Sequence, residues 1–373
     1  MGGDAAPGPE VAGAVEAVRS HGSQVVLVGN EALLRPELER LGATGLAIPI
    51  RHCSEVITMH DHPGQAVRGK RDASMRVAFE MVRRGEASAV VSAGNSGAIL
   101  ACGLLILRRL KGLDRPGIAA ALPTIERDPS GAISGVGQCL LLDTGANVEV
   151  KPYTLAQFAV LGATFARLRL NDQNGQPRRR PRVGLLSNGE EASKGTQVLR
   201  DAHALLMQSP SPDFEYVGFV EGRDLFQWHR AGDAQRVGGA LDVAVTDGFT
   251  GNVVLKTAEG AGRFLAEFLR MQVKRSLLAQ LGALLMRPVL RSLKQVVDVD
   301  GRGGAPLLGV DGVAIICHGR ASARAIARAI AVAEEHVAAG LLPALQQAIA
   351  AHRGLGPGGN TSSSPAGQSV ESE

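Results

Sequence analysis

Gly94, Asn95, Ser96 and Gly97 form a short glycine-rich turn that follows an apolar run and precedes a helical pattern. Small residues let the backbone approach a ligand closely, and the first N–H groups of a helix attract an anion. We therefore predict that this turn binds phosphate through its backbone N–H groups and the Ser96 hydroxyl.

Three further turns combine glycine with polar side chains at the end of an apolar run. They cover residues 141–147, 187–195 and 246–252. In open α/β sheets, ligands bind where the loops at the carboxyl ends of the strands converge. We expect these turns to meet at one site; the alternative is that each is only a capping turn.

Ser96 also supports a different function. Gly94, Ser96 and Ala98 are spaced as in the nucleophile elbow of α/β-hydrolases, with Ala98 in place of the second glycine. Asp247 and His318 follow in the order that those enzymes use. The alternative function is therefore a serine acyl hydrolase that uses Ser96, Asp247 and His318.

Several patterns that usually indicate metals or nucleotides fail in this sequence. Residues 64–70 have the spacing of a phosphate loop, but Arg71 replaces the hydroxyl residue that would hold Mg²⁺. In the motif His60-Asp61-His62 the alternating histidines have no further ligand nearby, and the four cysteines are too scattered for a zinc site. Residues 354–359 match the spacing of a dinucleotide-binding fingerprint only by chance. The chain therefore has no usable nucleotide-binding motif, which argues against a dehydrogenase. We expect no metal and no cofactor.

The elements that must position these turns alternate along the chain. Strand-like apolar runs cover residues 24–29, 87–92, 118–122, 137–143, 183–187, 214–220, 241–246 and 312–317. Helical patterns cover residues 72–84, 95–111, 154–169, 196–208, 251–290 with at least one break, and 321–339. This alternation predicts an α/β fold with a mostly parallel sheet that is covered on both faces.

The composition is that of a globular protein, with 45% apolar and 20% charged residues among 373. A net charge of +4 and 3% aromatic residues argue against a nucleic-acid binder, which needs dense positive charge and stacking rings. No signal peptide or membrane-spanning run is visible, so we expect a cytoplasmic protein. Residues 354–373 are rich in Gly, Ser and Pro and predict a disordered tail.

Residues 263–295 predict a protruding amphipathic helical hairpin. Its apolar residues are flanked by cations, and Pro288 must end or kink a helix. This pattern is typical of a helix that lies in a membrane interface; the alternative is an ordinary core or dimer helix. The residues that we expect to contact a membrane are Leu277, Leu278, Leu281, Leu284 and Leu285.

Long segments of the sequence resemble the bacterial acyl-ACP:phosphate acyltransferases of phospholipid synthesis. They are MGGD at residues 1–4, VITMHDHPGQAVRGKRDASM at 56–75, SAGNSGA at 92–98, LLLDTGANVEVKP at 140–152, GLLSNGEEASKG at 184–195, FVEGRDL at 219–225, DVAVTDGFTGNVVLKTAEG at 242–260 and GGAPLLGVDGVAIICHG at 303–319. The resemblance covers residues 1–340, which predicts a single domain of that extent. Family members usually carry an apolar strand before MGGD, and Ala5 and Ala73 replace residues that are common in the family.

The resemblance implies a Rossmann-like α/β/α sandwich of the isocitrate and isopropylmalate dehydrogenase type, used without a nucleotide. It implies a homodimer that moves acyl chains from acyl carrier protein to inorganic phosphate and so makes acyl phosphate. It also implies peripheral attachment to the inner face of the cell membrane, with the glycerol-3-phosphate acyltransferase that uses acyl phosphate as a further partner. The family's two catalytic residues fall on Lys194 and Asn252.

On this basis we expect Lys194 to stabilise the charge of phosphate or of the oxyanion, and Asn252 to donate an amide hydrogen bond at the same place. The residues that we expect to orient these groups are Asp143, Asn147, Glu190, Asp247 and His318. Because the carrier protein is acidic, we expect it to contact Arg287, Arg291 and Lys294, with the arginine-rich residues 178–182 as a second choice.

Overall fold

The structure is a computed structural model of the chain. It describes residues 1–127, 132–170, 179–227, 240–297 and 303–356.

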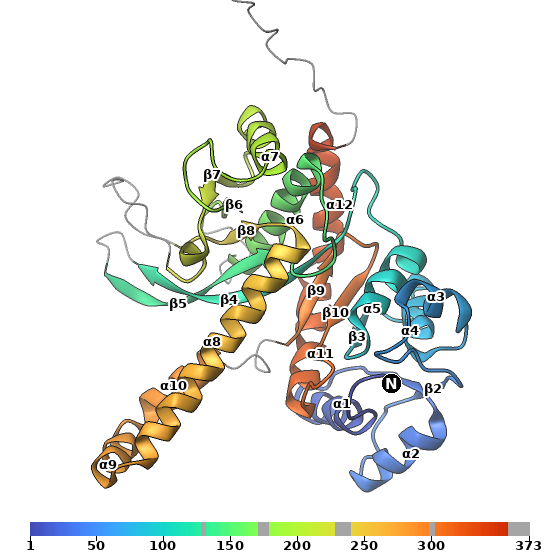
Figure 1. Cartoon of the computed structure of the whole chain (residues 1–373). Helices are drawn as coiled ribbons and strands as arrows, with labels where there is room; N and C mark the ends of the chain where they lie inside the picture. Colours follow the sequence, from blue (N-terminus) through green and yellow to red (C-terminus); the bar gives the residue numbers. More distant parts are fainter. Residues whose placement is uncertain (128–131, 171–178, 228–239, 298–302, 357–373) are drawn as a thin grey trace, which may run out of the picture.

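An eight-stranded mixed sheet forms the centre of the molecule (Figure 1). In order across the sheet, the strands are β3 (Ala89–Ser92), β10 (Val313–Ile316), β9 (Ala305–Leu308), β4 (Gly117–Arg127), β5 (Ile133–Leu142), β8 (Val243–Val245), β6 (Arg182–Leu186) and β7 (Glu215–Val220). Two further strands, β1 (Leu27–Gly29) and β2 (Ile50–His52), pair in parallel as a separate small sheet. The predicted α/β class with a mostly parallel sheet is therefore confirmed.

The strands of the large sheet run in two opposite directions. β3 is parallel to β10, whereas β5, β8, β6 and β7 are parallel to one another. Between these groups, β9 is antiparallel to both β10 and β4, and β4 is antiparallel to β5. The carboxyl ends of β3 and β10 therefore lie at the opposite edge of the sheet from those of β5, β8 and β6.

Helices cover both faces of the sheet. Successive residues of β5 point to opposite faces, and those on each face are buried against a helix. Leu140 and Leu142 pack on the buried helix α6 (Pro152–Leu170), which also contacts α7 (Gln197–Gln208) and α12 (Leu341–Ala351). Cys139 and Leu141 face the other side and pack against the start of α8 (Gly248–Lys274).

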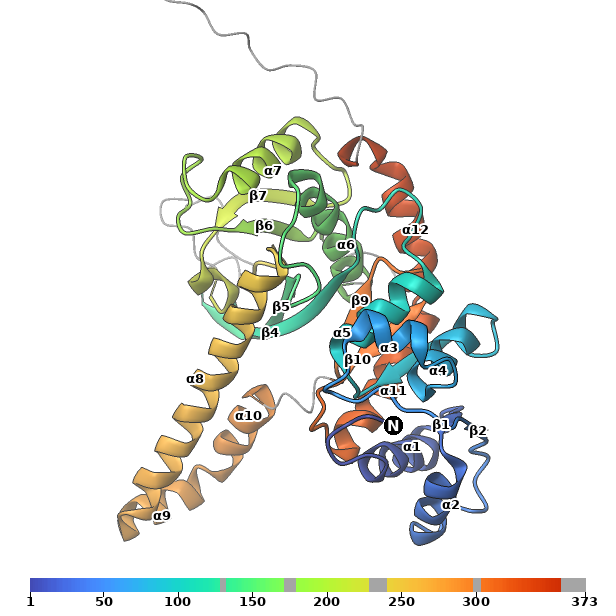
Figure 2. The same cartoon turned by 45° about the vertical axis from the view of Figure 1, so that its right-hand side comes forward.

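Smaller helices surround the β3 end of the sheet (Figure 2). They are α1 (Gly8–His21), α2 (Glu31–Arg40), α3 (Pro63–Gly69), α4 (Ser74–Arg83), α5 (Ser96–Cys102) and α11 (Ala323–Ala338). Gly13 lets α1 pack closely on α11, because any Cβ at this position would lie only 2.6 Å from the Cβ of Ile326. α5 continues as a π-helical segment, Gly103–Leu107, and ends where Arg108 adopts a φ of 72°.

α8 extends away from the sheet, α9 (Leu277–Leu285) lies at its far end, and α10 (Arg287–Val297) runs back from there toward the sheet (Figures 1 and 2). Met286 separates α9 from α10, and Pro288 occupies the first turn of α10, where a proline breaks no helical hydrogen bond. The apolar side chains of α9 are exposed: Leu277 and Leu278 are 83% and 82% accessible. Within the described residues, none of the helices is both long enough and apolar enough to cross a bilayer.

Most predicted elements are present with slightly different ends, but several real ones were not predicted. The missed elements are β2, β9, α1, α2, α3 and α12. The predicted tail at residues 354–373 lies outside the described residues except for its first three, and Arg353–Leu355 form a 3-10 turn.

Candidate functional site

Asp143 organises the turn that follows β5. Its buried carboxylate accepts hydrogen bonds from the backbone N–H groups of Ile118, Gly145, Ala146 and Asn147 at 2.8–3.1 Å. The side-chain amide of Asn147 donates to the same carboxylate and to the carbonyl of Pro116, both at 2.8 Å. Burial raises the pKa of the Asp143 carboxyl, while these hydrogen bonds act in the opposite direction. Asp143 and Asn147 therefore hold the turn in shape and are not free to react.

The first turn of α8 is pressed against this Asp143 turn. A Cβ at Gly248 would lie 2.8 Å from the backbone nitrogen of Asn147, and a Cβ at Gly251 would collide with the carbonyl oxygen of Asp143. Glycine is required at both positions because the two backbones touch. The fit fixes where the positive end of the α8 dipole lies.

Asp247 caps α8, and Asn252 follows in the next turn. The Asp247 carboxylate accepts hydrogen bonds at 2.8 Å from both the backbone N–H and the hydroxyl of Thr250. This is a normal helix cap, so Asp247 supports α8 structurally. Asn252 is exposed and has no hydrogen-bond partner for its side chain among the described residues.

Lys194 lies in the loop between β6 and α7, at the edge of the sheet where α8 begins. β6 pairs with β8 so that Leu185 is level with Val245, which brings the loops after the two strands to the same edge. Asn188 accepts a hydrogen bond from the backbone N–H of Gly195 at 2.9 Å and closes the loop. The Lys194 side chain is exposed, and no described carboxylate forms an ion pair with it.

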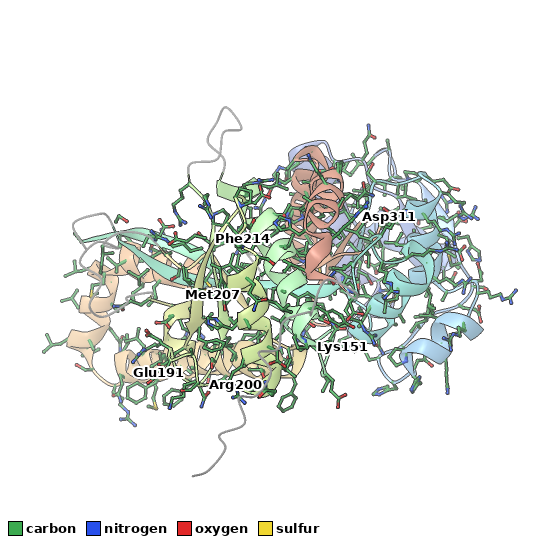
Figure 3. All side chains as sticks on the ribbon, turned by 90° about the horizontal axis from the view of Figure 1, so that it is seen from above. Lys151, Glu191, Arg200, Met207, Phe214 and Asp311 are labelled. Carbon is green, nitrogen blue, oxygen red and sulfur yellow. The ribbon has the colours of Figure 1, made fainter. Side chains whose placement is uncertain are left out.

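Neighbours of Lys194 in the same region either form ion pairs or are exposed. Glu190 lies 3.7 Å from Arg223, which also pairs with Glu221 at 3.1 Å. Figure 3 shows Glu191 and Arg200, on either side of Lys194 in the sequence, at the rim of the molecule. The loop therefore presents Lys194 to solvent while Arg223 partly neutralises the neighbouring Glu190.

The turn at residues 94–97 lies at the other edge of the sheet. The Asn95 side chain caps α5 through Ala98 N–H at 3.1 Å and donates to the carbonyls of Thr58, Met59 and Asp61 at 3.2–3.3 Å. Ser96 is exposed, and its hydroxyl has no partner among the described residues. β9 and β4 reverse the strand direction between this turn and the other three. The Asp143 turn nevertheless adjoins α5, because Ala146 packs on the apolar cluster that contains Ala98 and Ile99. The meeting of all four turns at one site stays a prediction.

Sequence reasoning missed the pair that supports this turn. Lys70 Nζ lies 2.6 Å from Asp61 and 2.9 Å from the carbonyl of Val56, and Asp61 also binds Thr58. The hydrogen bond from Lys70 lowers the pKa of Asp61 to about 2. An Asp and a Lys nine residues apart in a loop are too common a pattern to have revealed this pair.

His318 follows β10, beside the residue 94–97 turn. Its Nδ1 atom accepts a hydrogen bond from the backbone N–H of Arg320 at 3.2 Å, whereas a catalytic triad requires Nδ1–H to donate to the aspartate. Asp247 is engaged in capping α8 at the opposite edge. The serine acyl hydrolase alternative with Ser96, Asp247 and His318 is therefore not supported.

The arginines chosen as a second carrier contact have internal partners. Arg179 forms a bidentate ion pair with Asp242 at 2.5 and 2.8 Å, and Arg180 donates to the carbonyl of Ser211. Arg182 pairs with Glu215 at 3.4 Å, and Arg178 lies outside the described residues. These guanidinium groups hold β6 and its surroundings together and are not a free cationic surface.

The described part of the chain contains neither a metal-binding cluster nor a reactive thiol. No group of three His, Cys, Asp or Glu residues there could hold a metal ion. All four cysteines are buried and free. Burial raises the pKa of Cys53 to about 11 and that of Cys102 to about 12, which keeps both thiols protonated.

Comparison with known proteins agrees with the resemblance seen in the sequence. A family model described as "Fatty acid synthesis protein" matches residues 1–343. The chain is 48% identical over 337 residues to a phosphate acyltransferase of Syntrophotalea carbinolica, covering 90% of this chain and 88% of that protein. It is also 48% identical over 357 residues to one from Myxococcus xanthus, covering 94% and 93%.

Solved structures with a similar fold are phosphotransacetylases. One from Streptococcus pyogenes superposes with a TM-score of 0.58 at 18% identity, covering 92% of this chain and 91% of that one. The EutD phosphotransacetylase from Staphylococcus aureus gives a TM-score of 0.54 at 14% identity, covering 88% and 92%. At this identity they show the fold alone. The family model and the relatives, which match nearly the whole sequence, show that the chain belongs to the phosphate acyltransferase family of fatty acid synthesis enzymes.

Proposed function

We propose that this enzyme transfers a fatty acyl group from acyl carrier protein to inorganic phosphate and releases acyl phosphate for phospholipid synthesis. The observation that carries the proposal is the placement of Lys194 and Asn252. Both side chains are exposed and uncommitted, and they follow neighbouring parallel strands at the edge where α8 begins. A cation, an amide and a helix N-terminus together form an anion site.

The chemistry needs position and charge more than a protein nucleophile. A phosphate oxygen attacks the thioester carbonyl, the new C–O bond forms, the C–S bond breaks, and the carrier thiolate leaves with the electron pair. Lys194 offsets the charge of phosphate and of the oxyanion, and the Asn252 amide donates a hydrogen bond to it. Holding the reactants together can lower the barrier by about 7–11 kcal/mol, and one oxyanion donor contributes about 2.7–4 kcal/mol.

The remaining polar residues of the site position Lys194 and Asn252. Asp143 and Asn147 shape the turn against which α8 begins, Asp247 caps that helix, and Glu190 sets the charge of the Lys194 loop. We assign the second phosphate contact to residues 94–97, with His318 beside them. In support, the Ser96 hydroxyl is free, and Ala146 of the Asp143 turn packs on the apolar cluster that contains Ala98 and Ile99 of α5.

Exposed apolar surfaces support a proposal about the assembly of the protein and its location. We propose that residues 1–340 form one domain of the isocitrate and isopropylmalate dehydrogenase type, with residues 263–295 as its protruding hairpin. A homodimer would cover apolar side chains of α8 such as Phe264 and Phe268, which are exposed in the single chain. The leucines of α9 would hold the protein on the inner face of the cell membrane, near a glycerol-3-phosphate acyltransferase that uses its product.

The acidic carrier protein would meet exposed cations. Arg287 and Arg291 are exposed on α10; the side chain of Lys294 lies outside the described residues. Exposed Arg115 and Lys151, which border the Asp143 turn, form a second cationic surface. Complementary charge of this kind speeds the encounter and is weakened by salt.

The proposal is tested with Lys194→Met and Asn252→Ala. Each should lower kcat for phosphate-dependent acyl transfer by about 10²–10³-fold, as for the loss of one oxyanion contact. Circular dichroism and thermal unfolding should stay as in the wild type, because both side chains are exposed. Lys256→Met, an exposed lysine further along α8, serves as the matched control and should keep its activity. Near-normal turnover in Lys194→Met or Asn252→Ala would remove that residue from the mechanism.

A further inference from the structure

A cavity of about 570 Å³ lies away from the Lys194 site, on the face of β4 and β5 that α6 covers. Ala119 and Ala121 of β4 form its floor, and their small side chains leave the space open. Phe165 and Leu168 of α6 and Val332 of α11 supply apolar walls. The volume is within the usual range for a small-molecule site.

Three nitrogen-bearing side chains from two helices also line this cavity, beside its apolar walls. Arg169 lies over the ring of Phe165 and donates a hydrogen bond to Gln138 of β5. Arg328 of α11 also lines the cavity and pairs with Glu335 at 2.7 Å. His336 packs edge-on against Phe165 with ring centroids 5.0 Å apart.

The polar groups of the cavity carry more positive than negative charge, and one of them has no hydrogen-bond partner. The Nδ1 atom of His336 is buried and has no hydrogen-bond partner among the described residues. Glu335 is the one carboxylate among the cavity-lining residues. It pairs with Arg328 and also attracts Arg169, so one negative charge serves two guanidinium groups, and Arg169 donates its hydrogen bond to the neutral Gln138. A buried polar nitrogen without a partner is costly, so it marks a place where a bound group would be favourable.

We propose that this cavity is a second binding site for an anionic amphiphile, with the acid group on Arg169 and His336 and a hydrocarbon chain along Ala121, Phe165 and Val332. The shared chemistry is a carboxylate or a phosphate monoester on an alkyl chain. Hydrogen bonds from a guanidinium and an imidazole satisfy such a head group, and the apolar walls exclude water from the chain. The inference does not depend on the acyl transfer mechanism, because none of these residues belongs to that site.

The test is calorimetric titration of the full-length protein with dodecanoate, dodecyl phosphate and dodecanol, each below its micelle concentration. We expect both anions to bind and dodecanol to bind at least about tenfold more weakly, because it lacks the charge that Arg169 recognises. The relative affinity of the two anions then identifies which head group the site prefers.

Variants separate this cavity from the other places where an amphiphile could bind. Arg169→Met should weaken anion binding about tenfold or more, and Ala121→Phe, which fills the floor, should abolish it. Lys194→Met and Leu281→Asp should leave the affinity unchanged, because they alter the acyl transfer site and the α9 surface instead. Arg169→Met should also keep normal acyl transfer.

Three results would overturn the inference. They are the absence of anion binding, dodecanol binding as tightly as the anions, and unchanged affinity in both Arg169→Met and Ala121→Phe. The Lys194→Met result under Proposed function is independent of all three, so each proposal can fail alone.

Discussion

Asp143 and Lys194 illustrate two different uses of charge in this enzyme. The Asp143 carboxylate is buried and satisfied by backbone and side-chain donors, so it fixes a turn. Lys194 is exposed and free to meet an anion. The residue types identified both as polar groups in glycine-containing turns, and the roles expected for them came only from the family resemblance. Burial and hydrogen-bond partners decide them, and both depend on contacts with distant residues such as Ile118.

The buried His336 side chain leads to a prediction about how the stability of the protein depends on pH. Burial, and then the charge of Arg169, lowers its pKa from 6.5 to about 4, so the folded protein keeps the ring neutral. The unfolded chain binds a proton near pH 6.5, and stability is therefore lost as the pH falls from 6.5 to 4. The loss attributable to this group is about 3 kcal/mol.

The measurement is urea unfolding of wild type and His336→Gln at pH 7, 6, 5 and 4.5. The wild type should lose stability more steeply than the variant over this range, since only the wild type carries the titrating ring. Equal slopes for the two proteins would show that His336 is not held neutral.

At the scale of elements, α8 links the site to the rest of the molecule. Its first turn lies on the Asp143 turn, its next residues pack on β5, and the remainder extends to α9. The sequence predicted a long, broken helix here because the apolar periodicity and Pro288 are local signals. It missed β9 because Ala305–Leu308 is a four-residue strand between glycines, which pairing with β4 and β10 stabilises and local propensity does not.

Two glycines of α8 provide a matched pair of substitutions. Gly251→Ala should destabilise the protein by more than about 3 kcal/mol, because the new Cβ meets the Asp143 carbonyl and the helix must move. Gly260→Ala has open space around the new Cβ and should stabilise the helix by about 0.5–1 kcal/mol. Chemical unfolding measures both values, and a tolerated Gly251→Ala would contradict the close contact between α8 and the turn.

At the scale of the whole molecule, the decisive feature is the reversal of strand direction between β10 and β5. Local sequence carries no information on strand direction, because pairing through β9 and β4 joins residues far apart in the chain. For this reason the α/β class could be predicted, whereas the opposite direction of the strands that carry the polar turns could not. The exposed leucines of α9 could be predicted, because their pattern is contained in one short segment.

The α9 surface predicts reversible membrane binding. Replacing Leu277, Leu281 and Leu285 together by Asp should release the protein from anionic vesicles in a flotation assay. Each leucine that enters the interface contributes about 1.5–3 kcal/mol, and acidic residues add repulsion. Acyl transfer in solution should stay near normal. Leu33→Asp, at an exposed leucine of α2, is the control and should still float; a triple variant that floats equally well would exclude α9 as the contact.

The central claim is that phosphate itself attacks the thioester, with no acyl group on the protein. Intact-protein mass spectrometry tests it most directly, on enzyme mixed with acyl carrier protein and quenched before and after phosphate is added. The account predicts an unmodified enzyme mass at every time, and carrier deacylation that begins only when phosphate is present. An enzyme mass raised by one acyl group, or deacylation that proceeds equally without phosphate, would contradict it.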